Sequence, residues 1–157
     1  MSEPKIVHST FVIERSYAVS PARVFSALSD PATVRRWYAD GEGRQAEAFD
    51  MDFRISGRQR LASRMGETTP FPGVILASDA VYLDIAPGER VVMAQTMTLG
   101  ERRISAALIT YEIIASGDRT DLTFTHQGAF FEGADGPQMR EQGWRYLLEG
   151  LGAELAR

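Results

Sequence analysis

The sequence contains no cysteine, and this absence excludes several kinds of chemistry. A chain without cysteine forms no disulfide, offers no thiolate nucleophile and cannot bind zinc through sulfur. Long apolar runs are also lacking, because no segment approaches the roughly 18 consecutive apolar residues that a membrane-spanning helix needs. The N-terminal residues lack the apolar segment of a signal peptide. We therefore expect a cytoplasmic protein.

Residues suited to metals or nucleic acids are scarce. There are two histidines, His8 and His126, and a single lysine, Lys5. The net charge of −4 is spread along the chain, which argues against nucleic acid as a partner. Asp50 and Asp52 alternate on a predicted strand without a histidine nearby. No metal site is predicted, and no cofactor is expected.

Length and composition are those of a globular domain. The chain has 157 residues, of which 44% are hydrophobic and 24% are charged. A chain of this length is most simply one domain that can bury a substantial core. We therefore predict a single domain over residues 1–157, with residues 1–8 as a flexible tail.

Two short helices are predicted after a first strand at residues 9–19. Ser20 can cap a helix over residues 20–28, with proline at its first position. Asp30 followed by proline repeats this arrangement for residues 30–39. The second helix follows the first directly, so the pair forms a helix–helix corner.

The middle of the chain has the alternation typical of strands with one buried face. The pattern predicts strands at residues 49–55, 58–65, 80–85, 91–97, 103–114 and 122–127. On one of them, Val81, Leu83 and Ile85 are predicted to share the apolar face. This series indicates an antiparallel meander.

A long helix is predicted at residues 138–155. Its apolar stripe consists of Trp144, Leu148, Leu151 and Leu155, at i, i+4, i+7 and i+11. Three glycines flank the stripe: Gly143, Gly150 and Gly152. Each costs about 1 kcal/mol relative to alanine within a helix. Either close packing or an unfilled hollow can explain them.

Several segments in the same order resemble one protein family. They are "VIERSYAVSPARVFSALSDPATVRRWYA", "YLDIAPGERVV", "RTDLTFTHQGAF" and "GWRYLLEGL". They are similar to the activator-of-heat-shock-protein-ATPase homologues of the START-like (SRPBCC) superfamily, particularly the small single-domain bacterial members. The resemblance implies an α+β helix-grip fold, in which six to seven antiparallel strands curve around a long C-terminal helix. His126 departs from the family pattern, in which many relatives have glutamate.

The resemblance implies a ligand cavity between the sheet and the C-terminal helix. The side chains expected to line it are Phe53, Met93, Gln95, Met97, Tyr111, Phe124, His126, Phe131, Trp144 and Leu148. His126 is either a core residue with a hydrogen-bond partner or an acid–base group. Its candidate partners are Thr110, Tyr111, Gln95 and Arg15. Phe130 and Phe131 form a flap over the cavity, a plug at its end or a dimer contact.

Three functions are compatible with the sequence. The first is a non-catalytic module that binds a small apolar or amphipathic molecule. The second is a cyclase or aromatase in which His126 acts with Tyr111 or Arg15. The third, by family resemblance alone, is a chaperone ATPase co-factor or stress-related protein. Eukaryotic members normally carry a further N-terminal domain that this sequence lacks, so a chaperone partner is not favoured. A homodimer remains an open alternative.

Overall fold

The computed structural model describes residues 3–41 and 45–157. The chain begins with strand β1 (Val7–Tyr17), followed by three short helical segments, α1 (Pro21–Ser29), α2 (Pro31–Val34) and the π-helix η1 (Arg35–Ala39). Six strands come next: β2 (Gln45–Met51), β3 (Arg58–Arg64), β4 (Ile75–Ala86), β5 (Arg90–Leu99), β6 (Arg102–Ser116) and β7 (Arg119–Phe130). Helix α3 (Pro137–Leu155) ends the chain.

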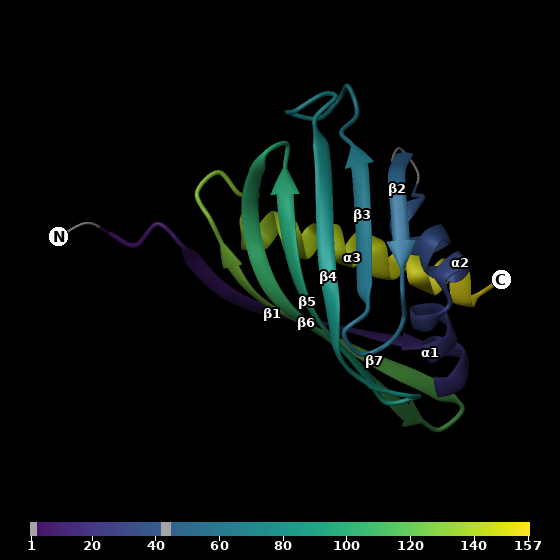
Figure 1. Cartoon of the computed structure of the whole chain (residues 1–157). Helices are drawn as coiled ribbons and strands as arrows, with labels where there is room; N and C mark the ends of the chain where they lie inside the picture. The colour runs from purple at the N-terminus through teal and green to yellow at the C-terminus, as the bar shows by residue number, and fades with distance from the viewer. Residues whose placement is uncertain (1–2, 42–44) are drawn as a thin grey trace.

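In the described part of the chain, all seven strands form one antiparallel sheet in the order β1-β7-β6-β5-β4-β3-β2. Figure 1 shows the sheet curving around α3, with α1 and α2 at one end of that helix. The fold is therefore α+β and confirms the predicted helix-grip arrangement.

The apolar stripe of α3 faces the concave side of the sheet. Trp144, Leu148, Leu151 and Leu155 are all buried. Trp144 packs closely on Phe124 of β7, with 4.4 Å between ring centroids. A fully buried large side chain contributes roughly 1.5–3 kcal/mol to stability. These contacts fix α3 against the concave face of the sheet.

Both predicted helix caps are present. The side chain of Ser20 accepts a hydrogen bond from the backbone N–H of Arg23. Asp30 accepts one from the backbone N–H of Thr33 and another from its hydroxyl. Because each cap satisfies a backbone donor that lacks an intrahelical partner, the first turns of α1 and α2 are each fixed locally.

Several predicted boundaries were wrong, including those of the first two strands. β1 starts at Val7, which pairs with Phe130, so the expected tail reaches two residues too far. β2 covers residues 45–51 instead of 49–55, because the chain turns after Met51. Phe53 therefore lies outside the strand, where it packs edge-on against Tyr82.

The predicted facing of β4 was also wrong. Ala80 and Tyr82 are buried on the concave face, whereas Leu83 is exposed. A register shift between Tyr82 and Asp84 in the pairing with β5 interrupts the alternation. A bulge of this kind moves the following residues to the opposite face, so Ile85 packs against the core although Leu83 does not.

Close packing explains two of the three glycines in α3. A Cβ atom on Gly150 would lie 3.3 Å from the Trp37 carbonyl oxygen, and one on Gly152 would lie 3.2 Å from the Tyr17 ring. Gly143 is exposed, and a Cβ atom added there would meet no neighbouring group within 4 Å. The interpretation of an unfilled hollow is therefore not needed.

We expect Gly143→Ala to raise the free energy of unfolding by about 1 kcal/mol, because alanine restricts the unfolded chain and meets no neighbour in the helix. Urea unfolding monitored by circular dichroism measures this change. Gly152→Ala is the matched control, and its free energy of unfolding should rise less, because the new methyl group would press on the Tyr17 ring. A loss of stability in Gly143→Ala would contradict the assignment of this position as an open helix surface.

Candidate functional site

The interior cavity lies under the helical corner. Its walls comprise Leu28 of α1, Val34 of α2, Trp37 of η1, and Gln59, Tyr82, Val91, Met93 and Tyr111 of the sheet. Its volume is only about 10 Å³, which is roughly the space for one water molecule. The predicted ligand-sized space between the sheet and α3 is instead filled by side chains of both elements.

The sheet side of this cavity is polar but uncharged. The Tyr82 hydroxyl donates to Gln59 Oε1 at 2.7 Å, and both residues are buried. Burial raises the pKa of both Tyr82 and Tyr111 above the ordinary tyrosine value. These hydroxyls therefore stay protonated at neutral pH. Because the Tyr82 proton is donated to Gln59, the Tyr82 hydroxyl can accept a hydrogen bond from a neutral group, whereas the Tyr111 hydroxyl can donate or accept one.

A second polar cluster centres on Tyr38 of η1. Its hydroxyl lies 3.1 Å from Ser78 Oγ of β4 and accepts from Gln95 Nε2 of β5 at 3.2 Å. All three residues are buried. The π-helical turn carries Trp37 and Tyr38 into the core together, so one short segment supplies both an apolar and a polar group to the interior.

The structure does not bring the predicted lining residues together in one place. Met93 and Tyr111 line the cavity. Gln95 does not line it but bonds Tyr38, which follows the lining residue Trp37 in the chain. Phe124, Trp144 and Leu148 are buried in the packing between the sheet and α3. Phe53, Met97 and Phe131 are half-buried, and His126 lies in a separate group of rings on β1 and β7.

His126 points inward and is fully buried, with 0% of its surface exposed. Its ring stacks on Phe11 at 4.6 Å between centroids and lies 5.9 Å from the Phe130 ring. Among residues 3–41 and 45–157, neither ring nitrogen has a hydrogen-bond partner. Burial, together with the charge of Arg140, lowers the pKa of His126 to about 4. The ring is therefore neutral at pH 7, and the four proposed partners do not bond it.

An ion pair lies beside this group of rings. Arg140 of α3 donates to both carboxylate oxygens of Asp135, at 2.8 and 2.7 Å, and to Ser105 Oγ at 3.0 Å. Its guanidinium carbon lies 5.1 Å from the centroid of the Phe130 ring. Phe130, the last residue of β7, is buried and closes this end of the core.

β7 extends further than predicted, so His126 is not its last inward residue. Gly128 and Phe130 follow it on the same face. A Cβ atom on Gly128 would lie 2.8 Å from His126 Cε1 and 2.9 Å from Phe130 Cε2. Gly128 therefore leaves room for the two rings above it.

Sequence reasoning missed most of the polar cavity wall. Gln59 of the cavity wall and Ser78 of the Tyr38 cluster were not recognised as buried, because polar residues on strands normally indicate the solvent face. Tyr82 was assigned to the wrong face because the bulge in β4 cannot be seen in the alternation. Tyr38, which lies within the segment 30–39 predicted to be helical, was the available signal for an inward polar group.

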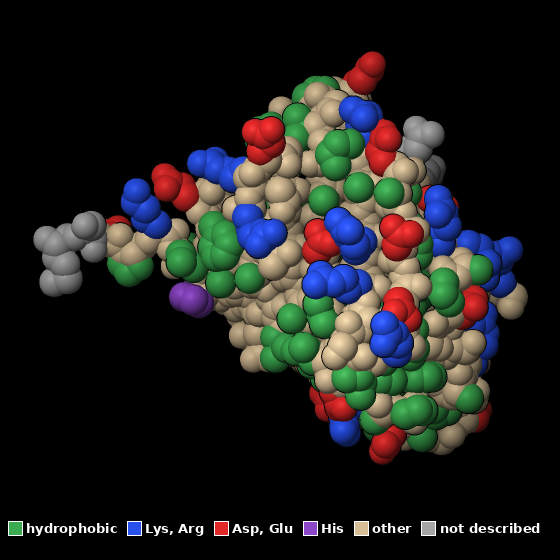
Figure 2. Space-filling model, viewed as in Figure 1, with side chains coloured by type: hydrophobic (Ala, Val, Ile, Leu, Met, Phe, Trp, Pro, Cys, Tyr) green, Lys and Arg blue, Asp and Glu red, His purple; other side chains and the backbone are tan. Residues whose placement is uncertain are grey.

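The outer face of the sheet has charges of both signs. Figure 2 shows blue and red side chains interspersed on this face. Ion pairs join Arg60 to Asp79 and Arg64 to Glu47. In the described residues, no helix is long and apolar enough to cross a membrane, and no group of acidic, histidine or cysteine side chains could hold a metal ion.

A curved antiparallel sheet wrapped around a C-terminal helix, with two short helices after the first strand, defines a START-like domain. Residues 18–156 match the model of one family within that class, described as "Activator of Hsp90 ATPase homolog 1-like protein". The chain belongs to this family. Among proteins with curated descriptions, none matches the chain.

Solved structures of bacterial proteins share the fold over nearly the whole chain. A Rhizobium leguminosarum protein is 38% identical, with a TM-score of 0.90 and 97% of both chains covered. The Mll3558 protein of Rhizobium loti is 46% identical, with a TM-score of 0.84, covering 95% of this chain and 98% of its own. CV1439 of Chromobacterium violaceum, at 22% identity and a TM-score of 0.77, covers 94% of this chain and 97% of its own. The last shows a common fold alone.

Proposed function

We propose that this protein is a non-catalytic binding module for a small, neutral, largely apolar molecule that bears a hydroxyl or carbonyl group. The observation that carries the proposal is the polar wall of the interior cavity. A core built only for stability is most simply filled with apolar side chains, because every buried polar group must find a partner. A cavity wall with amide and hydroxyl groups of Gln59, Tyr82 and Tyr111 is instead typical of a site that orients a ligand.

The uncharged wall supports a neutral ligand. An ionised carboxylate or amine would have to be buried without a counter-charge, which costs several kcal/mol. The cavity wall has no charged side chain among the described residues. A neutral ligand would gain from apolar contacts with Met93, Val91 and Trp37, while one polar group bonds to the wall.

Catalysis by His126 has less support. The ring is enclosed by Phe11 and Phe130, and the cavity wall does not include it. A general base must reach the proton it removes, either directly or through one water. The geometry therefore favours binding over the cyclase or aromatase hypothesis.

A matched pair of ligands tests the proposal. Calorimetry should detect binding of 2-naphthol, which is neutral at pH 7, and little or none of 2-naphthoate, which is an anion of similar shape. Tyr82→Phe should weaken 2-naphthol binding about fivefold, as expected for the loss of one hydrogen bond near 1 kcal/mol. Tyr146→Phe, a half-exposed tyrosine on α3, is the control and should leave affinity unchanged.

The opposite preference would overturn the proposal. If 2-naphthoate bound as tightly as 2-naphthol, the neutral wall would not be the site. Equal affinities of the wild type and Tyr82→Phe would likewise place binding elsewhere on the protein.

A further inference from the structure

The cavity has a roof that is separate from α3. Val34 and Trp37 cover it from α2 and η1, while its floor consists of strand residues. A volume of about 10 Å³ admits no organic molecule, so a wall must move before a ligand can enter. The strands are hydrogen-bonded to neighbours across the sheet, whereas α2 and η1 together form one short segment outside it.

We propose that α2 and η1, residues 31–39, form a hinged lid over the cavity, and that Glu154 of α3 latches this lid shut. The inference rests on the proposed binding function, for which it supplies the route of entry. Asp30 provides the hinge. Its extended backbone (φ −85°, ψ 117°) separates α1 from α2, while its carboxylate keeps the first turn of α2 intact.

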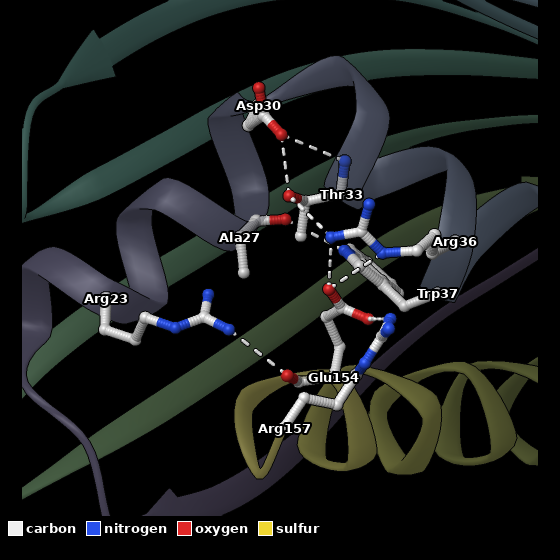
Figure 3. A network of polar contacts seen from close by, with 8 residues as sticks. All are labelled: Arg23, Ala27, Asp30, Thr33, Arg36, Trp37, Glu154 and Arg157. Carbon is white, nitrogen blue, oxygen red and sulfur yellow. Dashed lines mark hydrogen bonds and ion pairs between the residues drawn. The ribbon is translucent and has the colours of Figure 1, made fainter.

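The latch consists of a few polar contacts (Figure 3). Arg36 donates to Glu154 Oε1 through Nε at 3.0 Å and through Nη2 at 2.6 Å. Arg157 donates to the other carboxylate oxygen at 3.2 Å. Hydrogen bonds from both arginines lower the pKa of Glu154, which keeps it ionised. The carboxylate is thus charged and held from both sides.

The Arg36–Glu154 ion pair lies where η1 meets α3, at a place that water can reach. Only 7% of the Glu154 side chain is exposed, but 48% of the Arg36 side chain is. A surface groove of about 560 Å³ runs beside the contact, along η1 and α3. When Arg36 exchanges its carboxylate partner for water, Glu154 keeps its hydrogen bond to Arg157, so this contact can open without leaving the carboxylate unpaired.

Three other hydrogen bonds must break when the lid opens. Trp37 Nε1 donates to the Ala27 carbonyl of α1 at 2.8 Å, and the Tyr38 hydroxyl bonds the floor at Ser78 and Gln95. The segment that carries both side chains is π-helical. π-helical turns are rare and frequently occur at functional sites. Opening would therefore expose Trp37 and separate Ser78 and Gln95 of the sheet from Tyr38.

The two tryptophans of the chain permit a test without any ligand. Trp37 alone reports on the lid in a Trp144→Phe background, and Trp144 alone reports on α3 in a Trp37→Phe background. We expect Glu154→Gln to raise the acrylamide quenching constant of Trp37 at least about twofold, because the lid opens more often once its ion pair with Arg36 is lost. The quenching constant of Trp144 should rise less, because Tyr38 is its only lid neighbour among the rings it contacts in the described residues, and Phe124 and Tyr111 stay in place.

Glu141→Gln is the matched control, because it removes the Glu141–Arg145 ion pair from the same helix without touching the lid. Both quenching constants should keep their original values in this variant. Unchanged Trp37 quenching in Glu154→Gln would overturn the latch, and an equal rise at both tryptophans would show general loosening instead of a lid. Because no ligand is involved, the lid can fail while the 2-naphthol experiment succeeds, and the reverse also holds.

Discussion

Between pH 6.5 and pH 4, the wild-type protein should lose about 3 kcal/mol of unfolding free energy that a His126→Phe variant retains. The folded protein holds the pKa of His126 near 4, because the ring is buried beside the Arg140 guanidinium. The unfolded chain restores the ordinary pKa of 6.5 and therefore binds a proton in this window, whereas the folded state does not. This contribution to stability is complete above pH 6.5 and decreases as the pH falls toward 4.

The surroundings of His126 explain why its protonation is unfavourable. Phe11 faces it from β1, Ile109 pairs with it from β6, and Arg140 approaches from α3. Asp135 is the nearby acid, but its carboxylate is bonded to Arg140. A second positive charge would therefore be buried without a partner of its own.

Urea unfolding at a series of pH values measures this dependence. His126→Phe keeps a ring between Phe11 and Phe130 and removes the titrating group. His8→Gln removes the other, exposed histidine and should retain the wild-type pH dependence. If the wild type and His126→Phe lost stability in parallel between pH 6.5 and pH 4, the assigned environment of His126 would be wrong.

Trp144→Ala should lower the free energy of unfolding by roughly 3–5 kcal/mol at pH 7. The side chain is buried and contacts the rings of Phe124, Tyr38 and Tyr111, so its removal leaves a cavity between α3 and the sheet. Trp144→Phe should cost less, because a ring remains in the same place. Denaturant unfolding by far-ultraviolet circular dichroism provides the measurement.

Tyr146→Ala is the control for the position of α3. This residue lies two positions further along the helix and is half-exposed, so its truncation should cost less than about 1 kcal/mol. Similar losses in Trp144→Ala and Tyr146→Ala would mean that the helix does not present Trp144 to the sheet.

Local patterns were sufficient to predict the elements near the corner and the C-terminal helix. Ser20 and Asp30 act as caps because their short polar side chains reach the next turn, which depends on adjacent residues only. The spacing of Trp144 and Leu148 defines one helix face in the same way. Family resemblance then supplied the order and curvature of the sheet.

Met93 and Tyr111 of the cavity wall were predicted, but its other polar residues were not, because their burial depends on contacts between distant residues. Tyr82 faces inward because it bonds Gln59, which lies 23 residues earlier in the chain. Tyr38 meets Gln95 across 57 residues, and only the π-helical turn directs it there. Alternation reports which face of a strand is apolar, but it cannot reveal a polar residue that is buried with a partner.

The central claim is that a neutral ligand binds under the lid, against Met93. The chain has six methionines, and nuclear magnetic resonance of methionine-methyl-labelled protein follows them during a titration with 2-naphthol. Met93 lines the cavity, so we predict a saturable shift of its methyl resonance. The methyl resonance of Met139, which is 64% exposed on α3, should not shift. A Met93 resonance that stays fixed while 2-naphthol saturates the protein would contradict the proposed site.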